Sequence, residues 1–235
     1  GRRLRFPIAT AALACSLLAP CPSSAAEARR PNVLFIAVDD LRPELGCYGV
    51  PDIRTPAIDR LAASGVRFSR AYCQSSVCNP SRASLLTGLR PDSVQVWDLL
   101  VHFRETVPGI VTLPQHFRRN GYRTMAFGKV FHPSVSDPRS WDVPNYWPRY
   151  SSLYSEATLA RMKEREDAAR ANGWSEELVR GQVRGPALEV EDVPDNRRWD
   201  GEIAEQAMLS LVGLARSGQP FFLAVGFFSP HLPFV

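Results

Sequence analysis

The sequence has few of the features that mark membrane-spanning, repetitive or low-complexity chains. Its longest mostly apolar run, residues 6–18, is shorter than the roughly 20 residues that cross a bilayer. It contains no internal repeat and no low-complexity segment. Apolar residues make up 45% and charged residues 22% of the 235 positions, a balance typical of a globular protein with a sizeable core. We therefore expect one or two compact domains.

Strong charge of one sign is also missing. The sequence has 28 lysines and arginines against 24 acidic residues, which gives a formal net charge of only +4. This excess is small and scattered, whereas nucleic-acid-binding domains carry concentrated positive charge. We therefore expect no nucleic-acid partner.

The first 28 residues have the pattern of a signal peptide. Three arginines precede the apolar run, and the small residues of Ala26-Glu27-Ala28 follow it. We expect cleavage near Ala28, which leaves residues 29–235 as an exported chain, periplasmic or extracellular, without a stable membrane anchor. A lipoprotein site at Cys21 is the alternative, although Pro20 stands where such sites have a small residue.

Cysteine is scarce in the expected mature chain. Two of the five cysteines fall in the signal peptide, which leaves Cys47, Cys73 and Cys78. An odd number of thiols in an exported protein requires a chemical or structural explanation for one of them. We expect Cys47 and Cys73 to be buried thiols rather than ligands. A bond between them stays open, because sequence does not test its geometry.

Strands and helices alternate along most of the chain. The apolar run 32–38 predicts a strand buried on both faces of a mostly parallel sheet. Thr55-Pro56 and Thr112-Leu113-Pro114 are typical helix starts, and these helices are expected to end at Gly65 and at Asn120-Gly121. The other expected elements are strands at residues 66–72, 122–127 and 221–227 and a helix at residues 201–216. This order predicts an α/β layer sandwich.

Residues 133–198 differ from the rest, because proline, tryptophan and charge increase and no buried strand is evident. Within this segment, residues 155–172 predict a charged surface helix. We interpret residues 133–198 as a polar insertion over one edge of the sheet. The other parts of residues 29–235 then form one domain.

Four groups of polar residues directly follow apolar segments. They are Asp39-Asp40, Cys78 to Arg82, Lys129 with His132, and His231. In open α/β sheets, ligands and catalytic residues collect beyond the carboxyl ends of the strands. These groups are therefore the candidates for a functional site.

Asp39 and Asp40 carry neighbouring carboxylates. Such groups repel each other unless a cation lies between them, and Ca²⁺ takes roughly six to eight oxygen ligands. The pair therefore indicates a hard divalent cation. A helix N-cap or a solvated turn is the alternative for an Asp-Asp pair alone.

The segment Cys78-Asn79-Pro80-Ser81-Arg82 predicts the start of a helix that ends at Gly88, with Cys78 just before its first turn. Amides at a helix N-terminus attract anions, and the Arg82 guanidinium adds a fixed fork of donors for a tetrahedral oxyanion. The site therefore suits a sulfate or a phosphate. Without further modification, Cys78 would act as a thiolate nucleophile, as in thiol hydrolases.

The run from Cys78 to Gly88 resembles the signature of type I sulfatases, in which Cys-x-Pro-Ser-Arg is the recognition element of a maturation enzyme. The resemblance implies an alkaline-phosphatase-like α/β sandwich. It also implies that a formylglycine-generating or sulfatase-maturating enzyme oxidises Cys78 to formylglycine. The hydrated aldehyde would attack the sulfur of a sulfate ester, and its second hydroxyl would expel sulfate. An unmodified thiol could not perform that last step.

The resemblance extends from Arg30 to Val235. Three segments are similar to iduronate-2-sulfatases in particular: residues 31–42, residues 128–133, and residues 220–226 with Pro230-His231. The resemblance thus implies a sulfated carbohydrate substrate, specifically a 2-O-sulfated uronic acid in a glycosaminoglycan or another sulfated polysaccharide.

Catalytic roles follow from the resemblance position by position. Arg82 would hold the nucleophile, and Lys129 would contact the nucleophile and the sulfate. His132 would orient or deprotonate the nucleophile, and His231 would bind the sulfate or protonate the leaving oxygen. The histidines outside these motifs are expected to be structural: His102 and His116.

The resemblance also implies that Asp39, Asp40 and the modified Cys78 bind Ca²⁺. Type I sulfatases complete this site, and add a second lysine, with residues from much later in the chain. We therefore expect this chain to be the N-terminal part of a longer protein, with only part of the calcium site. The full-length protein would be active, whereas residues 29–235 alone would be poorly folded or inactive.

Two other functions stay open from the sequence. A phosphodiester or phosphonate monoester hydrolase would use the same tetrahedral-anion site, and some relatives share the same motif. A non-catalytic protein that binds sulfated glycans would keep Cys78 as a thiol and leave the sugar intact.

Overall fold

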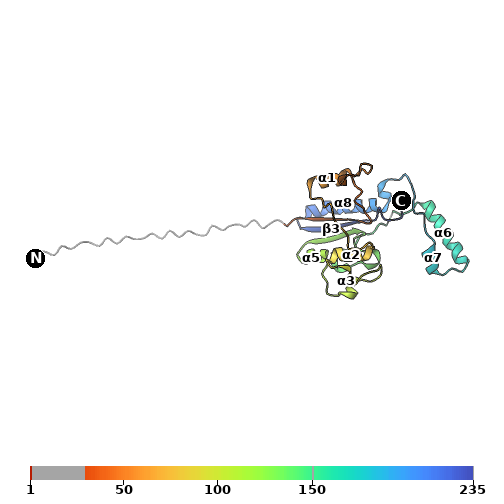
Figure 1. Cartoon of the computed structure of the whole chain (residues 1–235), viewed down its shortest axis with the longest axis horizontal. Coiled ribbons are helices and arrows are strands. Elements are labelled where there is room, and N and C mark those ends of the chain that lie inside the picture. Colours follow the sequence, from red (N-terminus) through yellow and green to blue (C-terminus); the bar gives the residue numbers. More distant parts are fainter. Residues whose placement is uncertain (2–29, 150, 235) are drawn as a thin grey trace. The chain divides into compact units, whose positions relative to one another are not determined.

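The computed structural model describes residues 1, 30–149 and 151–234 (Figure 1). The chain divides into a unit of residues 1–31 and a unit of residues 32–235, and the fold below is that of the second unit. The predicted cleavage site near Ala28 and the alternative at Cys21 lie outside the described residues. In the described part of the chain, no helix has the length and apolar character needed to cross a bilayer.

Three parallel strands form the sheet. They are β1 (Val33–Val38), β2 (Arg123–Gly128) and β3 (Phe221–Phe227), and their order across the sheet is β1-β3-β2. The register pairs Val38, the last residue of β1, with Phe227, and Gly128, the last residue of β2, with Gly226, so the strands end at one edge of the sheet. β3 is the central strand, and all its residues except the last are buried. The predicted α/β fold with a mostly parallel sheet is confirmed.

Helices pack on both faces of this sheet (Figure 1). The helices are α1 (Pro56–Ser64), α2 (Cys78–Thr87), α3 (Pro91–Val94), α4 (Phe103–Thr106), α5 (Leu113–Arg119), α6 (Glu156–Ala171), α7 (Glu176–Gln182) and α8 (Trp199–Ser217). Short 3-10 turns are η1 (Gly46–Tyr48), η2 (Pro133–Val135), η3 (Pro138–Ser140) and η4 (Asp195–Arg197). On one face, Ile203 of α8 packs with Leu223 and Val225. On the other, Leu86 of α2 packs with Phe222.

α5 and β2 follow the sequence prediction closely. Thr112 Oγ1 accepts a hydrogen bond from the Gln115 amide at 3.2 Å and so caps α5. Phe117 of α5 stacks on Phe222 of β3, with ring centroids 4.8 Å apart. β2 follows as expected, and the predicted helix at residues 201–216 and strand at residues 221–227 form α8 and β3.

The strand predicted at residues 66–72 is wrong. This segment is irregular, and Val66, Phe68 and Tyr72 are 83%, 69% and 81% exposed. The only strands in the described part of the chain are those of the three-stranded sheet, and none of them pairs with residues 66–72. β-propensity produces a strand only where a neighbouring strand completes the hydrogen-bond ladder.

The thiols of the second unit are free. Cys47 and Cys78 are half-buried, whereas Cys73 is exposed. The expectation of a buried thiol is therefore wrong for Cys73, which follows the irregular exposed segment 66–72.

The segment 133–198 has two parts. Residues 133–149 contribute buried side chains, and Trp141 packs against Phe222 with ring centroids 6.5 Å apart. Residues 151–198 carry α6 and α7. The hydroxyl of Ser155 accepts from the Thr158 amide at 3.2 Å and caps α6, which confirms the predicted helix at residues 155–172.

Candidate active site

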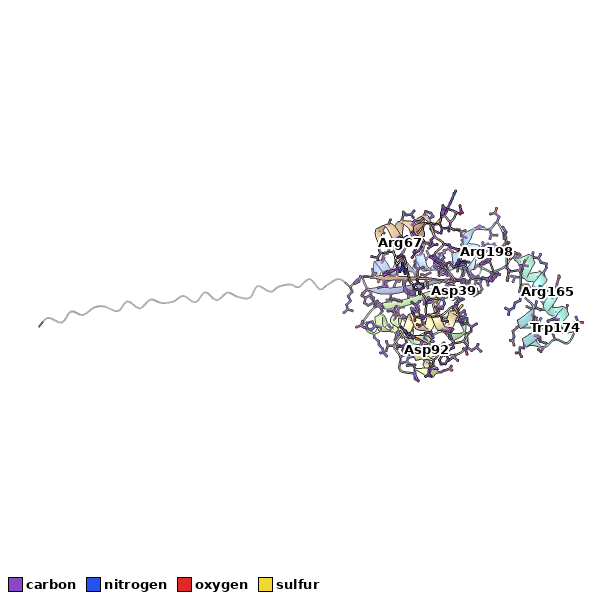
Figure 2. The ribbon with its side chains drawn as sticks, viewed as in Figure 1. Asp39, Arg67, Asp92, Arg165, Trp174 and Arg198 are labelled. Atoms are coloured by element: carbon purple, nitrogen blue, oxygen red, sulfur yellow. The ribbon has the colours of Figure 1, made fainter. Side chains whose placement is uncertain are left out.

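Asp39 is at the centre of a polar cluster beyond the carboxyl ends of the strands. It follows β1 (Figure 2). It is only 6% exposed and donates its amide hydrogen to the Phe227 carbonyl at 3.1 Å. Its carboxylate accepts hydrogen bonds from Arg82 of α2 at 2.9 Å and from the Lys129 ammonium. The Sγ atom of Cys78 lies 3.9 Å from the same carboxylate. The structure thus brings four of the predicted site residues together.

The charges of this cluster favour an anionic ligand. Burial alone would raise the pKa of Asp39, but the hydrogen bonds and charges of Lys129 and Arg82 outweigh it and hold that pKa below its usual range. The ionised carboxylate then faces two cations, so the group keeps one positive charge. Because the Nζ atom of Lys129 is 3.6 Å from Cys78 Sγ, this charge lies beside the predicted nucleophile.

Two glycines set the position of Lys129. Gly128 and Gly226 are paired where β2 and β3 end, and the Lys129 amide donates to the Gly226 carbonyl at 2.8 Å. Gly128 has a φ of +71°, and a Cβ there would lie 2.3 Å from the Gly226 oxygen. A Cβ on Gly226 would lie 2.1 Å from the Lys129 carbonyl. Only residues without side chains allow the backbones to approach this closely.

Cys78 is the first residue of α2, whereas the sequence placed it just before the helix. Val77 is the extended residue that precedes the helix. The side chain of Asn79 donates to the carbonyl oxygens of Asp98 and Val101, both at 2.9 Å. These bonds fix the start of α2 against the loop at residues 98–101. The predicted nucleophile, Cys78, therefore stands on a helix rather than in a loop.

Arg82 connects three segments from within the core. Its guanidinium donates to Asp39 after β1 and to the carbonyl oxygens of Lys129 and Val130 after β2, the last at 3.0 Å. Its Nε atom is buried and has no hydrogen-bond partner among the described residues. Arg82 thus holds the site together, and most of its donors are already in use.

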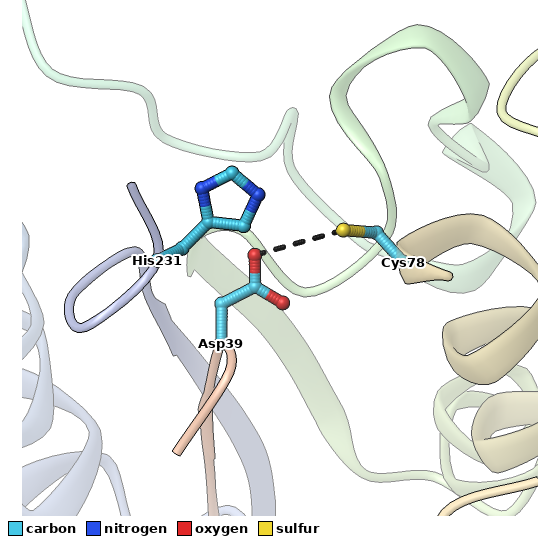
Figure 3. A group of neighbouring side chains, drawn as sticks. All are labelled: Asp39, Cys78 and His231. Carbon is cyan, nitrogen blue, oxygen red and sulfur yellow. Dashed lines mark hydrogen bonds between the residues drawn. The ribbon is translucent and has the colours of Figure 1, made fainter. Parts of the chain in front are cut away.

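Asp39, Cys78 and His231 offer ligand atoms that all lie within 4.8 Å of one another, which makes this group a candidate metal site (Figure 3). Asp40 has a φ of +54° and an exposed carboxylate, and its Oδ2 is 3.9 Å from His231 Nε2. The sequence placed Asp40 in the metal set and His231 at the sulfate. In the structure, His231 is the residue grouped with Asp39 and Cys78, and Asp40 lies next to it.

His132 is half-buried in the loop that follows β2. Burial lowers the pKa of His132, and the positive charges of Lys129 and Arg82 lower it further. The Nδ1 atom of the ring lies 2.8 Å from the Ser134 hydroxyl. Burial and the same cations therefore favour the neutral form of the His132 imidazole.

Sequence reasoning missed the residues that hold the site loops. The Asp200 carboxylate accepts from the amides of Phe228 and Ser229, at 2.8 and 2.7 Å, directly before His231. The ring of Phe228 lies under the Lys129 ammonium, 5.3 Å from Nζ to the centroid. The position of Asp200 in the first turn of a helix could have been read from the sequence. Its hydrogen bonds to the loop before His231 could not.

Comparison with known proteins gives these residues a context. A family model described as Sulfatase matches residues 31–235. Iduronate 2-sulfatase of Homo sapiens is 41% identical over 209 residues, which cover 86% of this chain and 36% of that protein. The chain thus spans about a third of the length of that relative.

Solved structures share the fold. A protein described as a 2-O GAG sulfatase superposes with a TM-score of 0.56 at 24% identity, over 86% of this chain and 35% of that chain. The phosphonate monoester hydrolase of Agrobacterium radiobacter gives the same TM-score and identity, over 86% of this chain and 41% of that chain. These likenesses concern the fold, and they agree with the α/β sandwich predicted from the sequence.

Proposed function

Because the chain belongs to the sulfatase family, we propose that the protein hydrolyses sulfate esters with a formylglycine nucleophile made from Cys78. The observation that carries the proposal is the position of Cys78 at the first turn of α2. Its Sγ atom lies 3.6 Å from the Lys129 ammonium and 3.9 Å from the Asp39 carboxylate. A helix N-terminus and a buried cation beside one side chain suit a nucleophile that attacks an anion.

The other residues have separate roles in this proposal. Lys129 neutralises the charge of the sulfate, and Arg82 and Asp39 hold Lys129 and α2 in register. His132 accepts a proton from the nucleophile, and His231 binds the sulfate or protonates the leaving oxygen. The hydrated form of formylglycine would supply one hydroxyl that attacks sulfur and a second that loses its proton, so that the aldehyde re-forms as the C–O bond to sulfate breaks.

We further propose that Asp39, Asp40 and the modified residue 78 hold Ca²⁺, with His231 beside them. The donor chemistry fits, because carboxylate oxygens are the ligands that Ca²⁺ prefers, and the ion would share the Asp39 carboxylate with Arg82 and Lys129. When bound, the ion supplies positive charge to the sulfate oxygens. Titration of the metal-free protein should raise its unfolding temperature with Ca²⁺ more than with Zn²⁺, and the reverse order would contradict the choice of ion.

The proposed substrate is a 2-O-sulfated uronic acid in a glycosaminoglycan or another sulfated polysaccharide. Its support is the 41% identity to a protein named for iduronate 2-sulfate. We propose that the enzyme meets this substrate after export to the periplasm or the outside of the cell. A mature N-terminus near residue 29, read by peptide sequencing of the native protein, is the expected sign of export.

The test combines modification with turnover. The complete protein is produced with and without a formylglycine-generating enzyme, and the tryptic peptide Ala71–Arg82 is weighed by mass spectrometry. We expect an aldehyde at residue 78 only with that enzyme, and turnover in proportion to the aldehyde content. Cys78→Ala should abolish turnover, whereas Cys73→Ala, in the same peptide, should retain it. A thiol at residue 78 despite an active maturation enzyme would overturn the proposal.

Matched aryl sulfate and aryl phosphonate substrates separate the related hydrolases. Preferred turnover of the sulfate, together with sulfate release from a 2-O-sulfated disaccharide, is the expected result. Preferred turnover of the phosphonate would assign the protein to the phosphonate monoester hydrolases instead. Binding of the sulfated disaccharide without turnover would indicate a non-catalytic glycan-binding protein.

A further inference from the structure

Each histidine of the candidate site has its Nδ1 atom close to an oxygen atom. His231 Nδ1 lies 2.6 Å from the Leu232 carbonyl oxygen, and His132 Nδ1 lies 2.8 Å from Ser134 Oγ. A carbonyl oxygen can only accept a hydrogen bond, so Nδ1 of His231 carries a hydrogen. A hydroxyl can donate or accept, so the other partners of Ser134 decide whether Nδ1 of His132 carries a hydrogen.

Ser134 uses its single hydroxyl hydrogen elsewhere. Its Oγ atom lies 2.7 Å from the Leu99 carbonyl oxygen, which can only accept. The hydroxyl hydrogen is therefore directed to Leu99, and the 2.8 Å contact to His132 requires a hydrogen on Nδ1. The opposite assignment would leave two oxygen atoms 2.7 Å apart with no hydrogen between them. It would gain only the contact from the Ser134 amide to Nδ1, which is 3.4 Å long.

We propose that Ser134 is a positioning residue that, anchored to the Leu99 carbonyl, holds His132 as the Nδ1–H tautomer. The neutral ring carries one N–H, so Nε2 keeps its lone pair. Among the described residues, no hydrogen bond involves Nε2 of His132. This nitrogen is therefore the one that can accept a proton.

The tautomer has a consequence for the reaction, and this part rests on the proposed function. A proton that leaves the hydroxyl of the nucleophile goes to Nε2, where an N–H bond forms as the O–H bond breaks. The resulting imidazolium already donates its other hydrogen to Ser134, so no rearrangement of the ring is needed. Ser134 acts through His132 and does not touch the reacting atoms.

His102 provides an internal reference with the opposite tautomer. Its Nδ1 atom accepts a hydrogen bond from the Arg104 amide at 3.1 Å, and its Nε2 atom lies 3.1 Å from the Ser136 carbonyl oxygen. An acceptor on Nδ1 and a donor on Nε2 require the Nε2–H form. One protein thus contains both tautomers, in rings whose partners are known.

Nitrogen NMR of the histidine rings tests the inference without any measurement of activity. The complete protein is labelled with ¹⁵N-histidine and studied in slightly alkaline solution, and the rings are assigned with His132→Gln and His102→Gln. We expect the hydrogen on Nδ1 in His132 and on Nε2 in His102. An Nε2–H form of His132 would overturn the inference whether or not the protein is a sulfatase.

Substitution of Ser134 tests the cause of the tautomer. Ser134→Ala should shift part of the His132 signal to the Nε2–H form, while Ser134→Thr, which keeps the hydroxyl, should preserve the Nδ1–H form. In an active preparation, Ser134→Ala should lower kcat by about threefold to tenfold with KM within about twofold, as expected for one lost hydrogen bond. Ser134→Thr should restore kcat, and Ser136→Ala, an exposed serine two residues away, should leave it unchanged. An unchanged tautomer in Ser134→Ala would contradict the proposal.

Discussion

Two segments of the chain begin with similar sequence patterns and end in different structures. In residues 55–72 and residues 112–127, threonine and proline start a helix, and a glycine turn and an apolar stretch follow it. The second segment forms α5 and β2, and β2 pairs with the central strand β3. The first forms α1, which has no buried residue, and then an irregular exposed chain. The local pattern therefore predicts the helix, whereas the strand depends on a partner strand.

The largest test of this contrast is removal of an aromatic ring from each region. Phe222 of β3 is 1% exposed and stacks on Phe117 of α5. Phe222→Ala should lower the free energy of unfolding by about 3–5 kcal/mol. Phe68→Ala removes the same atoms from a side chain that is 69% exposed, and should cost less than about 0.5 kcal/mol. Urea denaturation of both variants makes the comparison, and equal losses would show that the two segments are equally packed in solution.

Addition of a methyl group to a glycine in each region should have a smaller effect. A Cβ on Gly226 meets the Lys129 carbonyl at 2.1 Å, so Gly226→Ala should cost about 1–3 kcal/mol and displace Lys129. At Gly65 the nearest atom is the Leu61 oxygen at 3.3 Å, and φ is −129°. Gly65→Ala should change stability by less than about 1 kcal/mol. A Gly226→Ala variant with unchanged stability and turnover would contradict the tight crossing of β2 and β3.

The two helix starts differ in what their threonines bind. Thr112 Oγ1 accepts from the Gln115 amide and is also 2.5 Å from the Ser140 hydroxyl. Thr55 Oγ1 instead accepts from the Gly46 amide at 3.0 Å and donates to the Asp59 carboxylate at 2.9 Å, and it makes no cap. Thr112→Val should cost about 1–2 kcal/mol, and Thr55→Val about 0.5–1 kcal/mol. Thermal unfolding of both variants compares the two losses of stability. A larger loss for Thr55→Val than for Thr112→Val would contradict the distinction between a capping and a non-capping threonine.

The smallest expected effect is the loss of stability that protonation of Glu202 causes in mildly acidic solution. Burial alone would raise the pKa of Glu202 in α8, but hydrogen bonds from Tyr146, Arg149 and Ser151 lower it to about 2. Because the folded pKa is below the ordinary 4.5, the contribution of Glu202 is complete well above pH 4.5 and is lost as the pH falls from 4.5 to about 2. From about pH 7 to about pH 4, this loss is below about 1 kcal/mol.

Glu202→Gln isolates this effect from that of the other carboxylates. The free energies of unfolding of the variant and the parent should approach each other as the solution becomes more acidic. Tyr146→Phe, which removes one of the donors, should show an intermediate trend. A constant difference between parent and Glu202→Gln at all pH values would mean that the carboxylate is not held in its charged form.

The parts of the fold that the sequence predicted depend on local signals. Caps, proline and apolar periodicity placed α5, α6 and α8, and the continuous apolar runs placed the strands of the sheet. Part of the candidate site followed from one topological rule, since residues after parallel strands meet at one edge, whereas Cys78 and Arg82 followed from the helix-start motif. This rule gathered Asp39, Lys129 and His231 from positions far apart in the chain.

The parts that the sequence did not predict depend on partners without a sequence pattern. Ser134 meets the backbone carbonyl of Leu99, and Asp200 meets amides of the loop before His231. Any residue type can supply such backbone groups, so no motif reveals them. The strand expected at residues 66–72 was wrong for a related reason, because a strand needs a neighbour that its own residues do not specify.

The strand order has a consequence for how the protein folds. β3 lies between β1 and β2 although it comes last in the chain, and the Phe221 amide donates to the Asn32 side chain across 189 positions. Contacts between residues so far apart in the sequence form slowly, because a long loop must close before the contacts can stabilise the structure. During synthesis from the ribosome, β1 and β2 have no shared partner until β3 has emerged. The positions beside Cys78 therefore come together only after β3 has been synthesised.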